Sequence, residues 1–240
     1  MTSSSSLIRA RSLGMSRPTV STPGTGTLQV ESDQIEVIVV DDHLGIRKGV
    51  ELLLRDAGMR VAGVASGLEE ARALLARRRH DVALLDVHLG GENSLGLVEE
   101  VMSRHPQAGI VLYTGYTGPD AGLADAVRVG ARGFVLKSSP APVLIAALRA
   151  VAAGGTYIDV DLAAHLSAGA DLSRLARLSP REREILDLLA AGLTGQAIAS
   201  SLFLSPETVR THVRNATTKL GAKTRVQAVA LVVRARGSLM

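Results

Sequence analysis

The 240-residue sequence contains no cysteine and no tryptophan, and aromatic residues make up only 2% of it. Without cysteine, disulfides and thiolate catalysis are excluded, and a reducing cytoplasmic location is expected. The scarcity of aromatic rings argues against a single-strand nucleic-acid binder, because such proteins stack bases on aromatic side chains. No stretch approaches the roughly 18 unbroken apolar residues of a membrane span, so we expect no membrane association.

The first 33 residues are rich in Ser, Thr and Gly and show no apolar periodicity. Such a composition buries too little apolar surface to fold, so we expect residues 1–33 to form a disordered tail. Its first half is basic and free of acidic residues, as in a transit peptide, but it lacks the apolar core of a secretory signal. Met15 is an alternative start.

Charge is distributed unevenly over the rest of the chain. Residues 34–154 carry 13 Lys and Arg against 14 Asp and Glu, a net charge of −1, whereas residues 174–240 carry 11 against 4, a net charge of +7. A basic region beside a neutral one predicts a polyanionic partner at the C-terminal end only.

Residues 34–153 alternate short apolar runs with amphipathic stretches. The apolar runs span 35–40, 59–65, 81–86, 109–114 and 133–137, and the helical patterns span 46–56, 68–78, 95–104, 121–129 and 142–151. Five strands alternating with five helices predict an α/β fold, a doubly wound five-stranded parallel sheet covered by helices on both faces.

Polar residues stand where these apolar runs end. Asp41 and Asp42 follow the first run, and Asp86, Thr114 and Lys137 end the third, fourth and fifth. Ligands bind at the carboxyl ends of strands in such sheets, so the five side chains should meet at one edge. Adjacent carboxylates raise each other's pKa unless a cation lies between them, which predicts that the aspartates share a divalent cation. Alternatively, an aspartate here only caps the next helix.

Residues 178–236 show no strand pattern and are predicted to form four short helices. Ser179 and Glu182 have the spacing of a capping box. Counted with the cap residue Ser205, the connection between the predicted helices 194–202 and 205–220 is about three residues, the length of a helix-turn-helix connection.

Taken together, these features resemble a response regulator of the NarL/FixJ type. The resemblance covers roughly residues 35–236 and combines the strand-end residues of a receiver domain with a LuxR-type helix-turn-helix, "LSPREREILDLLAAGLTGQAIASSLFLSPETVRTHVRNATTKLGAKTRVQAVAL". It implies a flavodoxin-like receiver domain at 34–153, a linker with little apolar periodicity at 154–177, and a DNA-binding domain at 178–236.

The resemblance implies that Asp86 is the phosphoacceptor for a sensor histidine kinase or a small acyl phosphate. It also implies a Mg²⁺ ion, which suits a site with few carboxylates because it retains water and phosphate oxygens as ligands. The implied ligands are Asp41, Asp42, Asp86 and the backbone carbonyl of His88.

Lys137 and Thr114 would bind phosphoryl oxygens, and Phe134 occupies the aromatic switch position of the family. The alternatives are a solvated strand end for Lys137, an ordinary strand residue for Thr114 and an ordinary core residue for Phe134. His43 and His88 suggest zinc, but the six histidines lack metal-site spacing.

The segment that follows the phosphoacceptor departs from the family pattern at three positions. Leu89 and Gly90 stand where Met-Pro is usual, and Ser94 stands where Gly is usual. We expect Gly90 to loosen this loop, and Ser94 would be strained if its φ were positive.

In the DNA-binding domain the resemblance implies that residues 205–219 form the recognition helix, which enters the major groove of double-stranded DNA. The implied base contacts are Arg210, Thr211 and Arg214, and the implied phosphate contacts are Lys219, Lys223 and Arg225. A solvated charged face is the alternative, which the net charge of +7 disfavours. The last helix, 224–233, is too apolar to be solvated throughout and is predicted to be a homodimer face.

We therefore predict a transcription regulator whose phosphorylation controls dimerisation and DNA binding, with the unphosphorylated receiver covering part of the helix-turn-helix domain. The alternative is a regulator of the same shape that does not depend on phosphate. Aspartyl-phosphate hydrolases also place a nucleophilic Asp after a strand, but they usually have a second acid two residues later. Here that position is His88, so we predict that the protein is not an enzyme.

Overall fold

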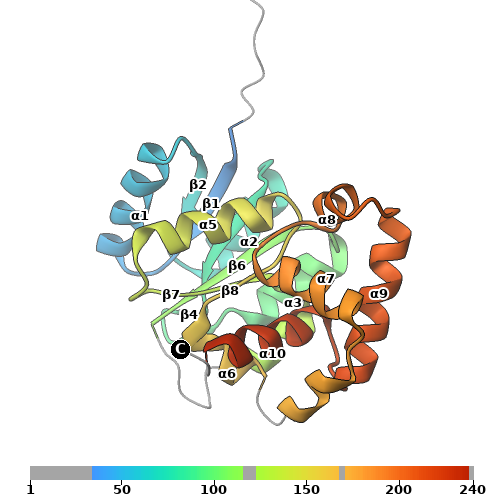
Figure 1. The fold of residues 1–240 in the computed structure, drawn as a ribbon. Helices are drawn as coiled ribbons and strands as arrows, with labels where there is room; N and C mark the ends of the chain where they lie inside the picture. The colour runs from blue at the N-terminus through green and yellow to red at the C-terminus, as the bar shows by residue number, and fades with distance from the viewer. Residues whose placement is uncertain (1–33, 116–122, 168–170, 238–240) are drawn as a thin grey trace, which may run out of the picture. The chain divides into compact units, whose positions relative to one another are not determined.

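The centre of the fold is a parallel sheet of six strands in the order β2-β1-β3-β6-β7-β8 (Figure 1). The structure, a computed structural model, describes residues 34–115, 123–167 and 171–237, so the predicted tail at 1–33 lies outside the described residues. The strands are β1 (Glu36–Val40), β2 (Arg60–Ala65), β3 (Val82–Asp86), β6 (Gly109–Thr114), β7 (Gly133–Leu136) and β8 (Tyr157–Ile158).

Helices cover both faces of this sheet, as predicted (Figure 1). They are α1 (Leu44–Asp56), α2 (Leu68–Arg77), α3 (Leu95–Arg104), α4 (Leu123–Val129) and α5 (Ala141–Ala152). Successive strand residues point to opposite faces, so Val37 and Val39 lie in one apolar cluster with residues of α1 and α5. Ile38 and Val40 lie in the other, with residues of α2, α3 and α4. Burial on both faces explains why the strands are continuous apolar runs.

The predicted linker contains secondary structure that the sequence analysis missed. Tyr157 and Ile158 form β8, which pairs in parallel with Gly133 and Phe134 of β7. The sheet therefore has six strands rather than the predicted five. Helix α6 (Val160–Leu166) and the 3₁₀ helix η1 (Leu172–Arg177) follow. A two-residue strand is too short to show a period-2 pattern, so the sequence carried no signal for it.

The C-terminal region contains α7 (Pro180–Ala190), α8 (Gly195–Ser201), α9 (Pro206–Leu220) and α10 (Arg225–Gly237). The predicted capping box at Ser179 and Glu182 is confirmed, with both of its hydrogen bonds present. At α9, Ser205 Oγ accepts a hydrogen bond from the Thr208 N–H at 3.0 Å. Such caps satisfy N–H groups that have no partner in the first helical turn.

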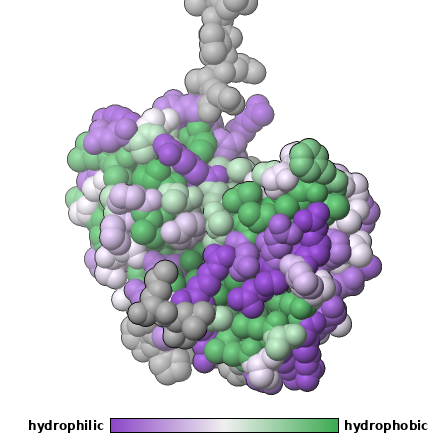
Figure 2. Space-filling view, viewed as in Figure 1, coloured by the Kyte–Doolittle hydropathy of each residue, from purple (hydrophilic) through white to green (hydrophobic). Residues whose placement is uncertain are grey.

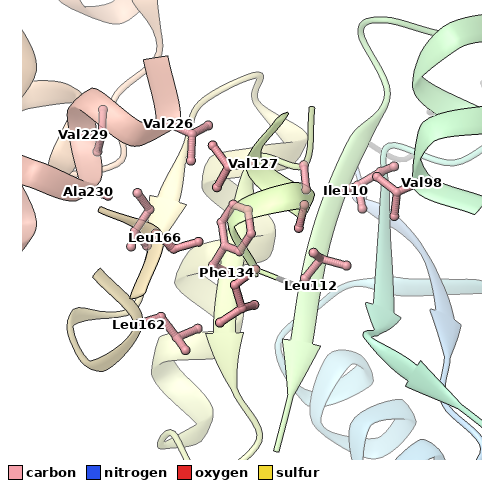
Figure 3. Packing of buried hydrophobic residues seen from close by; sticks show 14 of the residues in the cluster. Val98, Ile110, Leu112, Val127, Phe134, Leu162, Leu166, Val226, Val229 and Ala230 are labelled. Atoms are coloured by element: carbon pink, nitrogen blue, oxygen red, sulfur yellow. The ribbon is translucent and has the colours of Figure 1, made fainter. Parts of the chain in front are cut away.

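Helix α10 is buried along most of its length, and the described residues from Gln34 onward belong to one compact unit. It contacts α7 and α9 of its own domain and also α6, which precedes that domain in the chain. In Figure 3, Leu162 and Leu166 of α6 lie in the same apolar cluster as Val229 and Ala230 of α10. In this conformation, α6 covers apolar surface that we predicted to be a homodimer face. No helix in the described ranges is long and apolar enough to cross a membrane.

Phe203 is the one non-glycine residue with a positive φ, 54°, in the described part of the chain, and its side chain is 96% exposed. The left-handed conformation costs an L-residue roughly 1–2 kcal/mol, and this exposed ring recovers little of that cost. Asn tolerates the conformation, so we expect Phe203→Asn to raise the free energy of unfolding by about 0.5–1 kcal/mol, raising Tm by ~2 °C.

Thermal unfolding followed by circular dichroism would measure this effect. Phe203→Leu is the matched control, because it keeps a large apolar side chain in the same conformation and should give no gain. An Asn variant that melts below the Leu variant would contradict the prediction.

Candidate functional site

The residues predicted at the strand ends meet at one edge of the sheet. Asp42, Asp86, Thr114 and Lys137 line one pocket, and Asp41, only 2% exposed, lies beside it. Parallel strands bring their carboxyl ends to the same edge, which explains why residues up to 96 positions apart in sequence come together here.

Lys137 links the two buried aspartates of this pocket. Its Nζ lies 2.6 Å from Asp86 Oδ2 and 2.6 Å from Asp41 Oδ2. Burial by itself lowers the pKa of Lys137, but the hydrogen bonds and charges of the two carboxylates outweigh it, and the net shift of this pKa is upward. Lys137 therefore stays protonated and offsets part of the negative charge.

The acidic group has a geometry that fits a divalent cation. Asp41, Asp42, His43 and Asp86 each offer one ligand atom, and these atoms all lie within 4.8 Å of one another. Asp41 Oδ2 and Asp42 Oδ1 are buried oxygens that each lie in an ion pair, with Lys137 and with His43. Carboxylate oxygens of this kind suit a hard cation such as Mg²⁺.

His43 is a member of this group that the sequence analysis considered only for zinc. Its Nδ1 lies 2.7 Å from Asp42 Oδ1 and 3.3 Å from Asp41 Oδ1. Its position directly after the two acids was the available signal.

A short hairpin beside the pocket also corrects a prediction. β4 (His88–Leu89) pairs with β5 (Glu92–Asn93), and the connecting Gly90 and Gly91 have φ values of 59° and 86°. A two-residue turn with two positive φ values favours glycine at both positions. The Gly90 N–H donates to Asp42 Oδ2 at 3.1 Å, so this residue holds Asp42 instead of loosening the loop. Proline could supply neither the N–H nor the φ.

Gly90 also affects the charge of Asp42. Burial raises the pKa of Asp42. The hydrogen bond from the Gly90 N–H and the charge of the nearby His43 lower this pKa by more than burial raises it, so the net shift is downward. Ser94, the other departure, has a φ of −78°, so the strain that a positive φ would cause is absent.

Of the other predicted receiver residues, Thr114 and His88 line the pocket, whereas Phe134 lies in the apolar core. Thr114 is 1% exposed at the end of β6, and its carbonyl accepts a hydrogen bond from the Lys137 N–H at 2.8 Å. The His88 N–H donates to Asp86 Oδ1 at 3.2 Å. Phe134 is fully buried in the core, near Leu162 and Leu166 of α6 (Figure 3).

Two of the three predicted base contacts are exposed on α9. Arg210 and Arg214 are exposed, and Thr211 is half-buried. Arg210 pairs with Glu207 at 3.0 Å, but both side chains are 74% exposed, and such ion pairs contribute little to stability. In Figure 2, hydrophilic side chains gather over the region where Figure 1 places α7 and α9.

The predicted phosphate contacts divide into two groups. Lys223 is exposed. Lys219 Nζ instead lies 2.7 Å from Oε2 of the buried Glu182, and Arg225 Nη2 donates to Thr156 Oγ1 at 2.9 Å. These partners lie 37 and 69 positions away, which is why the sequence did not indicate either structural contact.

Comparisons with known proteins agree with this architecture. A model of the response regulator receiver domain matches residues 37–149, and a model of the luxR family of bacterial regulatory proteins matches residues 176–232. The DNA-binding transcriptional activator DevR/DosR of Mycobacterium tuberculosis is 38% identical over 200 residues, which cover 81% of this chain and 92% of that protein. The chain belongs to the NarL-type response regulators.

This response regulator is also 33% identical to the nitrate/nitrite response regulator protein NarP of Escherichia coli, over 87% of this chain and 99% of NarP. A solved structure of two RcsB dimers bound to two parallel DNAs has the same fold, with a TM-score of 0.52 and 23% identity over 84% of this chain and 99% of that chain. The regulator therefore combines a receiver domain, whose match includes all five strand-end residues, with a LuxR-type DNA-binding domain.

Proposed function

We propose that this response regulator is phosphorylated on Asp86 and that phosphorylation controls its dimerisation and its binding to double-stranded DNA in the cytoplasm. The receiver domain would span 34–153, the connecting segment 154–177 and the DNA-binding domain 178–236. The observation that carries the proposal is the pocket, in which Asp86 lies 2.6 Å from a protonated Lys137 within a group of three aspartates.

In the proposed reaction, an Asp86 carboxylate oxygen attacks the phosphorus of a phosphohistidine on a sensor kinase or of a small acyl phosphate. The new P–O bond forms as the bond to the donor breaks, and the donor leaves as imidazole or carboxylate. Lys137 and Thr114 would each bind a phosphoryl oxygen. Bound Mg²⁺ would offset charge on the transferring group. Its ligands would be Asp41, Asp42, Asp86 and the backbone carbonyl of His88.

For DNA recognition, α9 would enter the major groove, with Arg210, Thr211 and Arg214 at base edges. Lys223 would contact a phosphate. Lys219 and Arg225 would contact phosphates only after leaving the partners that they have in this conformation. The exposure of both arginines and the net charge of +7 in residues 174–240 support this arrangement.

The contact between α6 and α10 supports control of dimerisation. This contact is held by apolar packing, whereas the positive charges of Arg132 and Arg225, which lie near it, repel each other. Burial lowers the pKa of Arg132 and of Arg225, and the charge of Arg132 lowers that of Arg225 further. Among the described residues no carboxylate pairs with Arg225, which donates a hydrogen bond to the neutral Thr156 hydroxyl, and desolvating a charge without a counter-charge opposes a contact. Phosphorylation would release α10, and two chains would then bind an inverted repeat.

Treatment with an acyl phosphate and Mg²⁺ tests the function. Oligomeric state by light scattering and DNA affinity by fluorescence anisotropy are measured on the same sample. We expect a change from monomer to dimer together with tighter binding. Labelled protein that changes in neither respect would favour the phosphate-independent regulator, whereas steady turnover of phosphate esters would reveal a hydrolase.

Two alanine variants should separate base reading from phosphate contact. Arg214→Ala should weaken specific binding by roughly 1–3 kcal/mol and relax specificity at one base position. Lys223→Ala should weaken binding to all sequences alike and reduce the salt slope by about one, because one fewer phosphate is neutralised. Anisotropy titrations at several salt concentrations measure both effects. An unchanged slope for the Lys223 variant would remove Lys223 from the phosphate contacts.

A further inference from the structure

Asp159 lies between the end of strand β8 and the start of helix α6. Its N–H donates to the Phe134 carbonyl at 2.9 Å. Its Oδ1 accepts a hydrogen bond from the Asp161 N–H at 3.2 Å, which caps α6. The residue is 7% exposed. The backbone and one carboxylate oxygen of Asp159 therefore tie the start of α6 to the edge of the receiver sheet.

The second oxygen of the same carboxylate contacts the segment that carries Lys137. Asp159 Oδ2 accepts a hydrogen bond from Ser139 Oγ and lies 3.5 Å from the Leu136 N–H. Leu136 and Ser139 flank Lys137, whose Nζ bridges Asp41 and Asp86. One buried side chain thus connects the phosphorylation pocket to α6.

The charge of Asp159 has no cationic partner within 4.0 Å among the described residues. Asn caps helices about as well as Asp, and burying an unpaired carboxylate is costly. Capping α6 therefore does not account for a charged residue here. A second acceptor oxygen is needed only for the hydrogen bond to Ser139, so this contact accounts for the carboxylate.

Helix α6, whose start is held by Asp159, makes an apolar contact with α10. Leu162 is fully buried and Leu166 is 2% exposed, in one cluster with Val229 and Ala230 (Figure 3). Because α6 has only seven residues, a shift at its capped end moves the whole helix against α10.

We propose that Asp159 is a positioning residue that couples the Lys137 segment, residues 136–139, to α6 and thereby to α10. This inference rests on the proposed control by phosphorylation. To pair with a phosphoryl oxygen on Asp86, Lys137 must change its contacts with Asp41 and Asp86, and the Lys137 segment shifts with it. The bond between Ser139 and Asp159 transmits that shift to the start of α6.

The test compares Ser139→Ala with the wild-type full-length chain. Ser139→Ala removes the hydroxyl that contacts Asp159 and leaves the α6 cap intact. Ser138→Ala is the matched control, since Ser138 is exposed and is the neighbouring serine. Each protein is treated with an acyl phosphate and Mg²⁺, and phosphoryl content, DNA affinity and hydrogen exchange of the α6 amides are measured.

In the wild type and in Ser138→Ala, phosphorylation should raise DNA affinity by about 5–150-fold, the usual range of allosteric coupling. Ser139→Ala should be phosphorylated equally, but its affinity ratio should fall to near one, and phosphate should no longer change exchange in α6. Ser139→Thr, which restores a hydroxyl, should recover the ratio. If thermal unfolding shows that Ser139→Ala is not folded, Asp159→Asn is compared in its place, because it replaces the acceptor oxygen by an amide NH₂ group and keeps a capping oxygen for α6.

A Ser139→Ala protein that responds to phosphate like the wild type would overturn the coupling role of Asp159. Loss of labelling in this variant would also overturn it, because Ser139 would then act in the pocket itself. A wild-type chain that is labelled but shows no change in affinity would instead refute the proposed function, so the two failures are distinguishable.

Discussion

Replacing Asp86 with Asn should abolish phosphorylation of this response regulator. An amide cannot attack phosphorus as a carboxylate does, and it also removes the charge that lies 2.6 Å from Lys137 Nζ. Wild-type protein incubated with an acyl phosphate and Mg²⁺ should gain one acid-labile phosphoryl group, whereas Asp86→Asn should gain none. Intact-protein mass spectrometry before and after acid treatment measures the difference.

Asp125→Asn provides the matched control, because Asp125 is a receiver aspartate on α4 whose side chain is 62% exposed and paired with Arg128. This variant should be labelled like the wild type. Equal labelling of Asp86→Asn would mean that another side chain accepts the phosphoryl group, and the assignment of the pocket would then be wrong.

The second large effect should appear when the DNA-binding domain is separated from α6. A fragment of residues 174–240 lacks α6, so the face of α10 that α6 covers becomes available for dimerisation. We expect this fragment to bind the operator without phosphate. Unphosphorylated full-length protein should bind about 5–150-fold more weakly, in the usual range of allosteric coupling, and phosphorylation should restore the affinity.

Both affinities must be measured at one salt concentration, because DNA binding by basic proteins falls steeply with added salt. Light scattering should show the fragment as a dimer on DNA with half-sites roughly one helical turn apart. The unphosphorylated full-length protein could instead bind as tightly as the fragment and show no change on phosphorylation. That result would contradict control by phosphorylation and would favour the phosphate-independent regulator.

The pocket could be predicted from the sequence because a general rule of topology places its residues. Asp41, Asp86 and Lys137 lie far apart in the chain, but each follows an apolar run, and parallel strands bring their carboxyl ends to one edge. The caps at Ser179 and Ser205 could be predicted for a different reason. Their hydrogen bonds join residues three positions apart, so the local sequence contains both partners.

Family resemblance was less informative where this chain departs from the pattern. Gly90 was expected to loosen its loop, yet it forms a two-glycine turn whose N–H holds Asp42. That outcome depends on the backbone conformation of the turn and on a carboxylate 48 positions away. Neither can be read from the identity of a single residue.

By itself, the sequence determined the alternation of strands and helices, the acidic edge of the sheet and the basic C-terminal domain, since each is recorded in apolar periodicity or in residue charge. Only the tertiary structure decided that Tyr157 and Ile158 add a sixth strand, that Arg225 faces Thr156, and that α6 covers α10. These features depend on partners far away in the chain. A short strand or an apolar helix is compatible with many such partners, and packing of the whole chain selects among them.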